Sequence, residues 1–228
     1  MIYTVGHSTL PPQQFLGILV PDRITTVIDV RSHPGSSYVP VYGQEQMRRW
    51  LTADHIGYEW WPDLGGWAEQ DADQAERLCP YGVDVTAYTH GAFPKGRIAK
   101  KVGDGTNPRC PKHGGARRDG ECTCAQRRDP LWQNYGFYDY SFFMAQPRFL
   151  QAAQFLVQRG QQQDVAIMCA EAVWWRCHRA MIADWLAFTG VPATHLQPHR
   201  AEHQVRDRLG RYEPEILEIW RSTAAKPS

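Results

Sequence analysis

The sequence predicts an α/β protein with a mostly parallel central sheet flanked by helices, in a Rossmann-like three-layer arrangement. Three observations predict it. Strand-like and helical patterns alternate through the first 66 residues, a buried-strand run at 164–169 is followed by a helical pattern, and an irregular segment interrupts the two regular parts. Alternation of strands and helices favours a parallel sheet covered by helices.

The first regular part contains three runs rich in β-branched and aromatic residues, separated by two amphipathic patterns. Pro11 and Pro12 mark the start of the first helix and Pro21 its end. The expected elements are a strand at Ile2–Val5, a helix carrying Phe15, Leu16, Ile18 and Leu19, a strand at Thr25–Val30, a helix at Gln44–Ala53 and a strand at Gly57–Trp61.

The second regular part begins after residue 128. Its expected elements are a helix at Pro147–Arg159, a strand at Asp164–Cys169, a helix behind Cys177 that ends at Gly190, a strand at Ala193–Leu196 and a helix at Pro214–Arg221. We therefore divide the chain into residues 1–66, an insertion at 67–128, and residues 129–228. The insertion has no sustained period and is too long for an ordinary loop.

Composition indicates a folded globular protein: 43% of the residues are hydrophobic and 12% aromatic. The formal net charge is only +1, so any attraction to nucleic acid must be local. No apolar run reaches the length of a membrane span, and no charged region precedes the first strand. We therefore expect a cytoplasmic protein without a membrane partner. In a reducing compartment its six cysteines indicate metal or site chemistry rather than disulfides.

The stretch from Cys169 to Arg179 is the densest group of reactive side chains. It follows a buried strand and leads into a helix, where ligands bind in open α/β sheets and backbone N–H groups attract anions. His7 and Ser8 follow the first strand, and Asp29 and Arg31 end the second. The candidate catalytic residues are His7, Glu171, Cys169 and Cys177, and the candidate substrate-binding residues are Ser8, Asp29, Arg31, Trp174, Trp175, His178 and Arg179.

Each of these residues has an alternative, structural interpretation. Arg31 either binds an anion or pairs with an acid such as Asp29, Glu171 or Asp184. His7 either forms an acid and base couple with Glu171 or makes a structural hydrogen bond. Cys169 is either a nucleophile or a small buried hydrophobe. Trp174 and Trp175 either stack on a base or pack against the insertion. Cys177 and His178 are expected nearer the solvent and, because adjacent helical side chains diverge, not as a pair.

The insertion contains two close pairs of metal-ligating residues. Cys110 and His113 form one pair, and Cys122 and Cys124 form the other, eight residues later, with Cys79 and His90 as possible substitutes. Such pairs are typical of a structural zinc site in a zinc-knuckle-like segment; the alternative is a loop with incidental thiols. Residues 95–128 also carry ten Lys or Arg against three acids, a net charge of +7, which predicts contact with DNA or RNA between Lys95 and Arg128.

Several motifs in one order resemble the bacterial domain-of-unknown-function family 488. They are Thr4-Val5-Gly6-His7-Ser8-Thr9, Ile28-Asp29-Val30-Arg31, Leu64-Gly65-Gly66, Cys169-Ala170-Glu171 and Cys177-His178-Arg179. The resemblance implies a compact α/β domain in which these motifs meet at one pocket, and it implies no particular reaction. At 35–38, Gly-Ser-Ser-Tyr stands in place of a more basic stretch of the family pattern.

Three functional hypotheses follow. The first is a hydrolase or transferase acting on a nucleotide or nucleic-acid component, with an anion-binding pocket at the carboxyl ends of the strands. The second is a rhodanese-like, sulfur-handling enzyme that uses Cys169 or Cys177, although Arg176 and Arg179 lie farther from Cys169 than in that family. The third is a non-catalytic nucleic-acid-binding protein that uses the basic insertion. The sequence indicates no organic cofactor and no oligomeric state.

Overall fold

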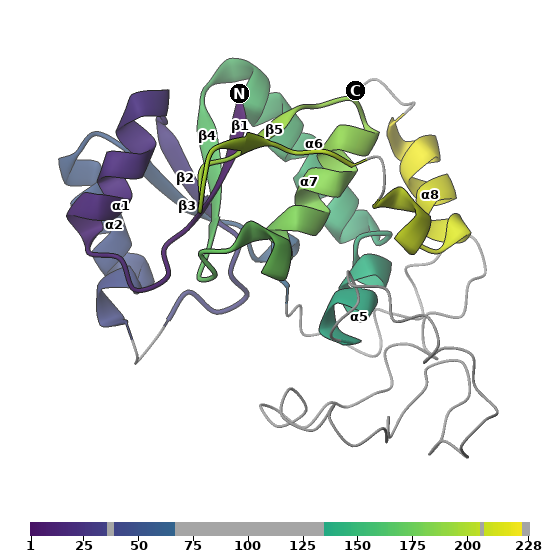
Figure 1. The fold of residues 1–228 in the computed structure, drawn as a ribbon, viewed down its shortest axis with the longest axis horizontal. Helices are drawn as coiled ribbons and strands as arrows, with labels where there is room; N and C mark the ends of the chain where they lie inside the picture. Colours follow the sequence, from purple (N-terminus) through teal and green to yellow (C-terminus); the bar gives the residue numbers. More distant parts are fainter. Residues whose placement is uncertain (36–38, 67–134, 206–207, 225–228) are drawn as a thin grey trace, which may run out of the picture.

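The computed structural model describes residues 1–35, 39–66, 135–205 and 208–224. Within these ranges six strands form one sheet in the order β3-β2-β4-β1-β5-β6 (Figure 1). The strands are β1 (Ile2–Gly6), β2 (Thr26–Asp29), β3 (Gly57–Trp60), β4 (Val165–Cys169), β5 (Ala193–His195) and β6 (Ala201–Glu202). β1 to β5 are parallel, and β6 runs antiparallel to β5. The predicted mostly parallel sheet is confirmed, with β4 and β1 at its centre.

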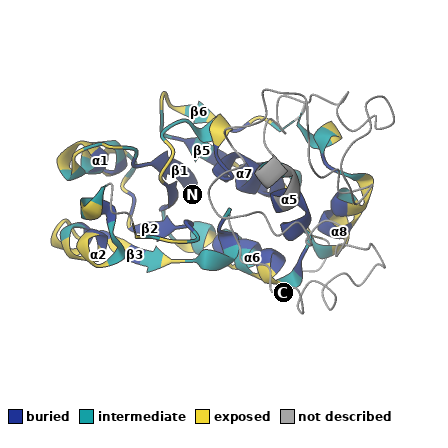
Figure 2. Cartoon of the chain, turned by 90° about the horizontal axis from the view of Figure 1, so that it is seen from below, coloured by how far each residue is buried: buried dark blue, intermediate teal, exposed yellow. Residues whose placement is uncertain are grey.

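Helices cover both faces of the sheet, which confirms the three-layer arrangement. The helices α1 (Pro12–Leu19) and α2 (Gln44–Ala53) lie on one face, and α6 (Pro147–Gln162) and α7 (Arg179–Phe188) lie on the other (Figures 1 and 2). Two further helices, α5 (Tyr135–Phe143) and α8 (Pro214–Ala224), lie on the side of α6 and α7. The core therefore consists of two apolar layers separated by the sheet.

Alternate residues of each central strand enter opposite layers. In β4, Val165 and Ile167 pack with the layer of α6 and α7, whereas Ala166 and Met168 pack with the layer of α1 and α2. All four are fully buried. A strand that is covered on both faces has no polar side, which explains the uninterrupted apolar run in the sequence.

The helix boundaries follow the expected signals. Pro12 lies in the first turn of α1, and Pro147 lies in the first turn of α6. Gly190 follows the end of α7 and has a positive φ of 81°. Helix α6 continues three residues beyond the predicted end, to Gln162. A Cβ on Gly160, in its last turn, would overlap the Ile2 side chain, so this glycine allows β1 to pack against α6.

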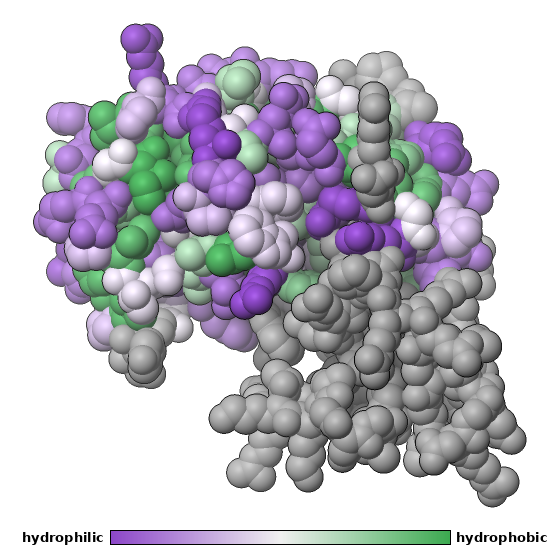
Figure 3. All heavy atoms as spheres, viewed as in Figure 1, coloured by the Kyte–Doolittle hydropathy of each residue, from purple (hydrophilic) through white to green (hydrophobic). Residues whose placement is uncertain are grey.

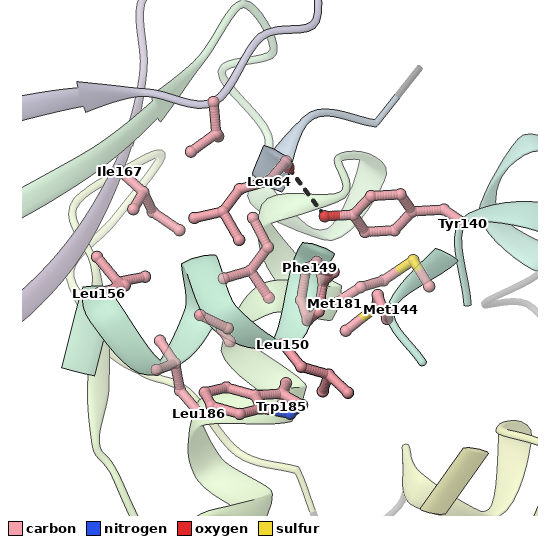
Figure 4. Packing of buried hydrophobic residues seen from close by; sticks show 14 of the residues in the cluster. Leu64, Tyr140, Met144, Phe149, Leu150, Leu156, Ile167, Met181, Trp185 and Leu186 are labelled. Atoms are coloured by element: carbon pink, nitrogen blue, oxygen red, sulfur yellow. Dashed lines mark hydrogen bonds between the residues drawn. The ribbon is translucent and has the colours of Figure 1, made fainter. Parts of the chain in front are cut away.

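The apolar layer that contains α6 and α7 extends to the carboxyl ends of the strands. The Tyr140 hydroxyl donates a hydrogen bond to the Leu64 carbonyl at 2.9 Å, and both residues are buried among Met144, Phe149 and Met181 (Figure 4). Leu64 precedes the segment 67–134 and Tyr140 follows it. This contact therefore ties together the two regular parts of the chain.

Hydrophilic and hydrophobic residues are interspersed on the face of the molecule shown in Figure 3. Among the helices of the described ranges, none is long and apolar enough to cross a membrane. The predicted zinc ligands Cys110, His113, Cys122 and Cys124 and the basic run 95–128 lie outside the described residues. Zinc binding and nucleic-acid contact by the insertion stay predictions.

Candidate functional site

The predicted corner forms where three neighbouring strands end. Cys169 ends β4, and the loops after β1 and β2 lie on either side of it. The backbone N–H of His7 donates to the Cys169 carbonyl at 3.0 Å, and that of Val30 donates to the Met168 carbonyl at 3.0 Å. Because parallel strands present their carboxyl ends at one edge, three distant motifs meet there.

Cys169, Cys177 and His178 form a tight cluster at this edge. The Nδ1 atom of His178 lies 3.9 Å from the Cys169 sulfur and 3.7 Å from the Cys177 sulfur. The two sulfurs and this nitrogen all lie within 4.8 Å of one another, so the three residues could hold a metal ion. Cys169 and Cys177, the two cysteines among the described residues, form no disulfide bond.

The cluster corrects two expectations about Cys177 and His178. Both are buried rather than open to solvent, and their side chains act as a pair. The physical reason is that neither lies inside the helix: Cys177 has extended backbone angles, φ −134° and ψ 148°, and His178 is the N-cap of α7. Divergence of adjacent side chains applies only to residues within a helix.

The orientation of His178 follows from its second nitrogen. Nε2 lies 3.0 Å from the Val30 carbonyl, which can only accept, so Nε2 carries the proton. The lone pair of a neutral His178 is therefore on Nδ1 and faces the two sulfurs. Tyr140 packs edge-on against the ring at 5.4 Å, which further fixes its position.

The two thiols differ in acidity. Burial raises the pKa of Cys177, but the hydrogen bond from Cys169 and the neighbouring His178 and Arg179 outweigh it, so this pKa lies well below its ordinary value. The hydrogen bond to Cys177, followed by burial, raises the pKa of Cys169. We assign the negative charge to Cys177, since the Arg179 Nε atom donates to its sulfur at 3.4 Å.

Arg179 is a fully buried guanidinium at the start of α7. Besides the Cys177 sulfur, it contacts the Glu171 carbonyl through Nη2, and its Nη1 atom has no hydrogen-bond partner among the residues that the structure describes. Within the described ranges no carboxylate lies within ion-pair distance of Arg179. The Cys177 sulfur is thus its only anionic neighbour there.

Arg31, in contrast, is saturated by protein groups. Its guanidinium donates to the Asp29 carboxylate, with Nη2 at 2.6 Å, and to the Tyr42 carbonyl at 2.8 Å. The Tyr58 hydroxyl also donates to Asp29 at 2.7 Å. Of the two interpretations of Arg31, the structure shows the pairing with Asp29. No sequence motif predicts the contact between Tyr58 and Asp29, because it arises from the pairing of β2 with β3.

His7 is held in a similar way. Its Nδ1 donates to the Ser8 carbonyl at 2.7 Å, and its Nε2 accepts from Arg31 Nη1 at 3.2 Å. Its ring stacks on Tyr42 with centroids 4.0 Å apart. Burial, followed by the charge of Arg31, lowers the pKa of His7 to about 4. Both ring nitrogens are occupied, so the geometry favours the structural interpretation of His7.

The remaining predicted residues lie around the cluster. Glu171 is exposed, and its carbonyl rather than its carboxylate contacts Arg179. Ser8 is half-buried and has a positive φ of 46°, and its N–H donates to the Ala170 carbonyl. Trp174 stacks on His195 at 3.9 Å, whereas Trp175 is 44% exposed. Of the two tryptophans, Trp175 is the more available to a ligand.

A buried network that the sequence did not predict lies beside Trp174. Asp184 accepts from His203 Nε2 at 2.7 Å, so His203 Nδ1 accepts from His195 Nε2 at 2.8 Å, and His195 Nδ1 accepts from the Thr4 hydroxyl at 2.7 Å. One direction of donation satisfies every group with both imidazoles neutral. Asp184, considered above as a partner of Arg31, instead belongs to this network. The residues of the network are far apart in the sequence, so no sequence motif predicts it.

The network predicts a loss of stability in acid. Burial, followed by the charges of His203, Arg179 and Arg208, lowers the pKa of His195 from 6.5 to about 3. Protonation therefore favours the unfolded chain: the stabilisation is complete above pH 6.5 and is lost as the pH falls towards 3. We expect the urea-unfolding free energy of the wild type to fall over this range.

His199 offers a matched control because its side chain is exposed. The variant His199→Gln should follow the wild-type pH dependence, whereas His195→Gln should show a smaller one. Equal pH dependence of His195→Gln and the wild type would contradict the assignment.

The comparisons with known proteins give one match. The family described as "Domain of unknown function DUF488" matches residues 11–90 and 110–186, more than half of the chain. No curated protein and no solved structure gives a significant match.

Proposed function

Because the chain belongs to the DUF488 family, whose description assigns no activity, we propose a function from its own site. We propose that the protein is a hydrolase or transferase that acts on an anionic substrate, a nucleotide or nucleic-acid component. The reaction centre is the cluster of Cys169, Cys177 and His178, and Arg179 binds the anionic group.

The observation that carries this proposal is the environment of Arg179. Removing a guanidinium from water is costly unless an anion and hydrogen bonds replace the solvent. Cys177 meets one side of Arg179, but Nη1 has no hydrogen-bond partner within the part of the chain that the structure describes. The guanidinium fork suits phosphate and carboxylate oxygens, and it lies directly beside the thiols. An anionic group of the substrate would complete this environment.

Trp175 supports the nucleotide as the substrate class. It lies in the 3-10 turn between β4 and α7 and is 44% exposed, so its ring is available for stacking. Base stacking on an aromatic side chain typically contributes about 1–3 kcal/mol. We therefore expect Trp175→Ala to raise KM for a nucleotide substrate and to leave turnover of p-nitrophenyl phosphate unchanged.

The test is turnover of p-nitrophenyl phosphate, bis-p-nitrophenyl phosphate and nucleoside mono-, di- and triphosphates by the full chain. Replacing Arg179 by lysine keeps the charge but removes the fork, so we expect kcat/KM to fall about 100-fold or more. Arg176→Met is the matched control, because Arg176 lies three residues earlier and is exposed. A folded wild type without turnover, or an Arg179→Lys variant with full activity, would overturn the proposal.

Sulfur transfer is the second candidate, favoured by two free thiols within 4.8 Å of each other. In this reaction the Cys177 thiolate attacks the outer sulfur of thiosulfate. The S–S bond breaks, sulfite leaves with its electron pair, and Cys177 becomes a persulfide that passes its outer sulfur to an acceptor nucleophile.

Intact mass after incubation with thiosulfate distinguishes this candidate. It predicts a gain of one sulfur atom in the wild type and in Cys169→Ser, and no gain in Cys177→Ser. A wild-type mass that stays unchanged argues against sulfur transfer and leaves the first proposal standing.

A further inference from the structure

We infer that Cys169, Cys177 and His178 bind one transition-metal ion, zinc or ferrous iron, with a fourth position open to substrate or water. The inference rests on the proposed function only for the identity of the open position's ligand. The site differs from the insertion's cysteine and histidine pairs, which the sequence favoured for zinc.

The first argument is geometric. With metal–sulfur and metal–nitrogen bonds of about 2.3 and 2.0 Å, a tetrahedral ion places sulfur and nitrogen ligands about 3.5 Å apart. The observed separations from His178 Nδ1 are 3.7 Å to Cys177 and 3.9 Å to Cys169. Both sulfur–nitrogen separations are therefore within a few tenths of an ångström of the tetrahedral value.

The second argument is the preparation of the ligands. Metal-binding histidines donate their other ring N–H to a carbonyl or carboxylate, which fixes the ring. His178 does so to the Val30 carbonyl at 3.0 Å and presents Nδ1 to the sulfurs. Arg179 Nε donates to the Cys177 sulfur, as expected beside a thiolate ligand. Without the Val30 contact, the His178 ring could rotate and would not hold Nδ1 towards the sulfurs.

The third argument concerns the open position and its charge. Among the described residues no fourth His, Cys, Asp or Glu joins the group. Three protein ligands and one open position are typical of catalytic rather than structural zinc. A dication and two thiolates are neutral together, so Arg179 leaves one positive charge, and its Nη1 atom, which has no partner among the described residues, is the group we expect to hold an anionic fourth ligand. Softness of the sulfur ligands favours zinc or iron over magnesium or calcium.

Cobalt(II) substitution of the full chain tests the inference. Tetrahedral cobalt gives visible bands, and thiolate ligands add a charge-transfer band in the near ultraviolet. We expect that band in the Cys122→Ser/Cys124→Ser variant, which lacks two of the predicted insertion ligands, and a loss of about tenfold or more when Cys177→Ser is added to it. A folded Cys122→Ser/Cys124→Ser variant without the band, or one that keeps the full band when Cys177→Ser is added, would overturn the inference.

A second measurement needs no folded variant. Alkylation by iodoacetamide followed by peptide mass mapping should show Cys169 and Cys177 protected in the metal-loaded wild type and modified faster after chelation. Equal modification in both states contradicts metal binding at this cluster. These readouts use no substrate. A chain that binds the metal but hydrolyses no phosphate ester would refute only the proposed function. A chain that hydrolyses phosphate esters but binds no metal at the cluster would refute only this inference.

Discussion

Replacing Asp184 by asparagine is expected to lower the free energy of unfolding by about 3–5 kcal/mol, the usual cost of breaking a buried ionic network. The carboxylate is fully buried and accepts from His203 at 2.7 Å, Arg208 at 2.6 Å and Tyr212 at 2.7 Å. All three partners donate. An asparagine NH₂ group in place of Oδ1 would face the donors of His203 and Arg208, and in either orientation Arg208 would lose its anion.

Urea unfolding at neutral pH measures this effect. Asp54→Asn is the matched control, because Asp54 is exposed at the end of α2, and its substitution should change stability by less than about 0.5 kcal/mol. A loss below about 1 kcal/mol in Asp184→Asn would show that the network contributes little. The prediction concerns stability alone, since Asp184 contacts no member of the thiol cluster.

Replacing Gly6 by alanine is expected to cost about 3 kcal/mol and to impair the site as well. A Cβ at this position would overlap the Glu171 carbonyl and approach Arg179 Nη2 to 2.8 Å. These atoms are a backbone group and a buried guanidinium, so neither can move easily. The cost should therefore lie near the upper end of the range for overpacked interiors.

Gly17→Ala is the control, because a Cβ there meets nothing within 4 Å and the residue lies in helix α1. It should stabilise the chain by about 0.5–1 kcal/mol. Urea unfolding measures both variants, and the cobalt spectrum reports whether the site changes. If Gly6→Ala is as stable as the wild type, the backbone at 170–171 can move away from the added Cβ at little cost in free energy.

Local patterns were sufficient for most elements of the regular parts, but they predicted neither the helix α5 nor the short strand β6. The apolar run at 165–169 predicted a central strand because a strand covered on both faces has no polar side. Prolines at the starts of α1 and α6 and a glycine after α7 marked the boundaries. These signals act over a few neighbouring residues, so sequence periodicity carries them.

The strand order brought distant residues together in ways that periodicity does not encode. Tyr58 reaches Asp29 because β3 pairs with β2, and His178 reaches Val30 because β4 lies beside β2. Sequence spacing likewise favoured the insertion as the metal site, whereas the ligand atoms that converge among the described residues belong to the corner. Convergence depends on the fold rather than on spacing.

By itself, the sequence determined the α/β class, most strands and helices of the two regular parts, and the corner at which their motifs meet. Tertiary structure decided what each reactive group can do there. Asp29 neutralises Arg31 and occupies it, whereas Arg179 is buried beside Cys177 with no carboxylate at ion-pair distance among the described residues. The physical reason is that the charge and the free lone pairs of a side chain depend on its partners in space, and the fold brings those partners together from distant parts of the sequence.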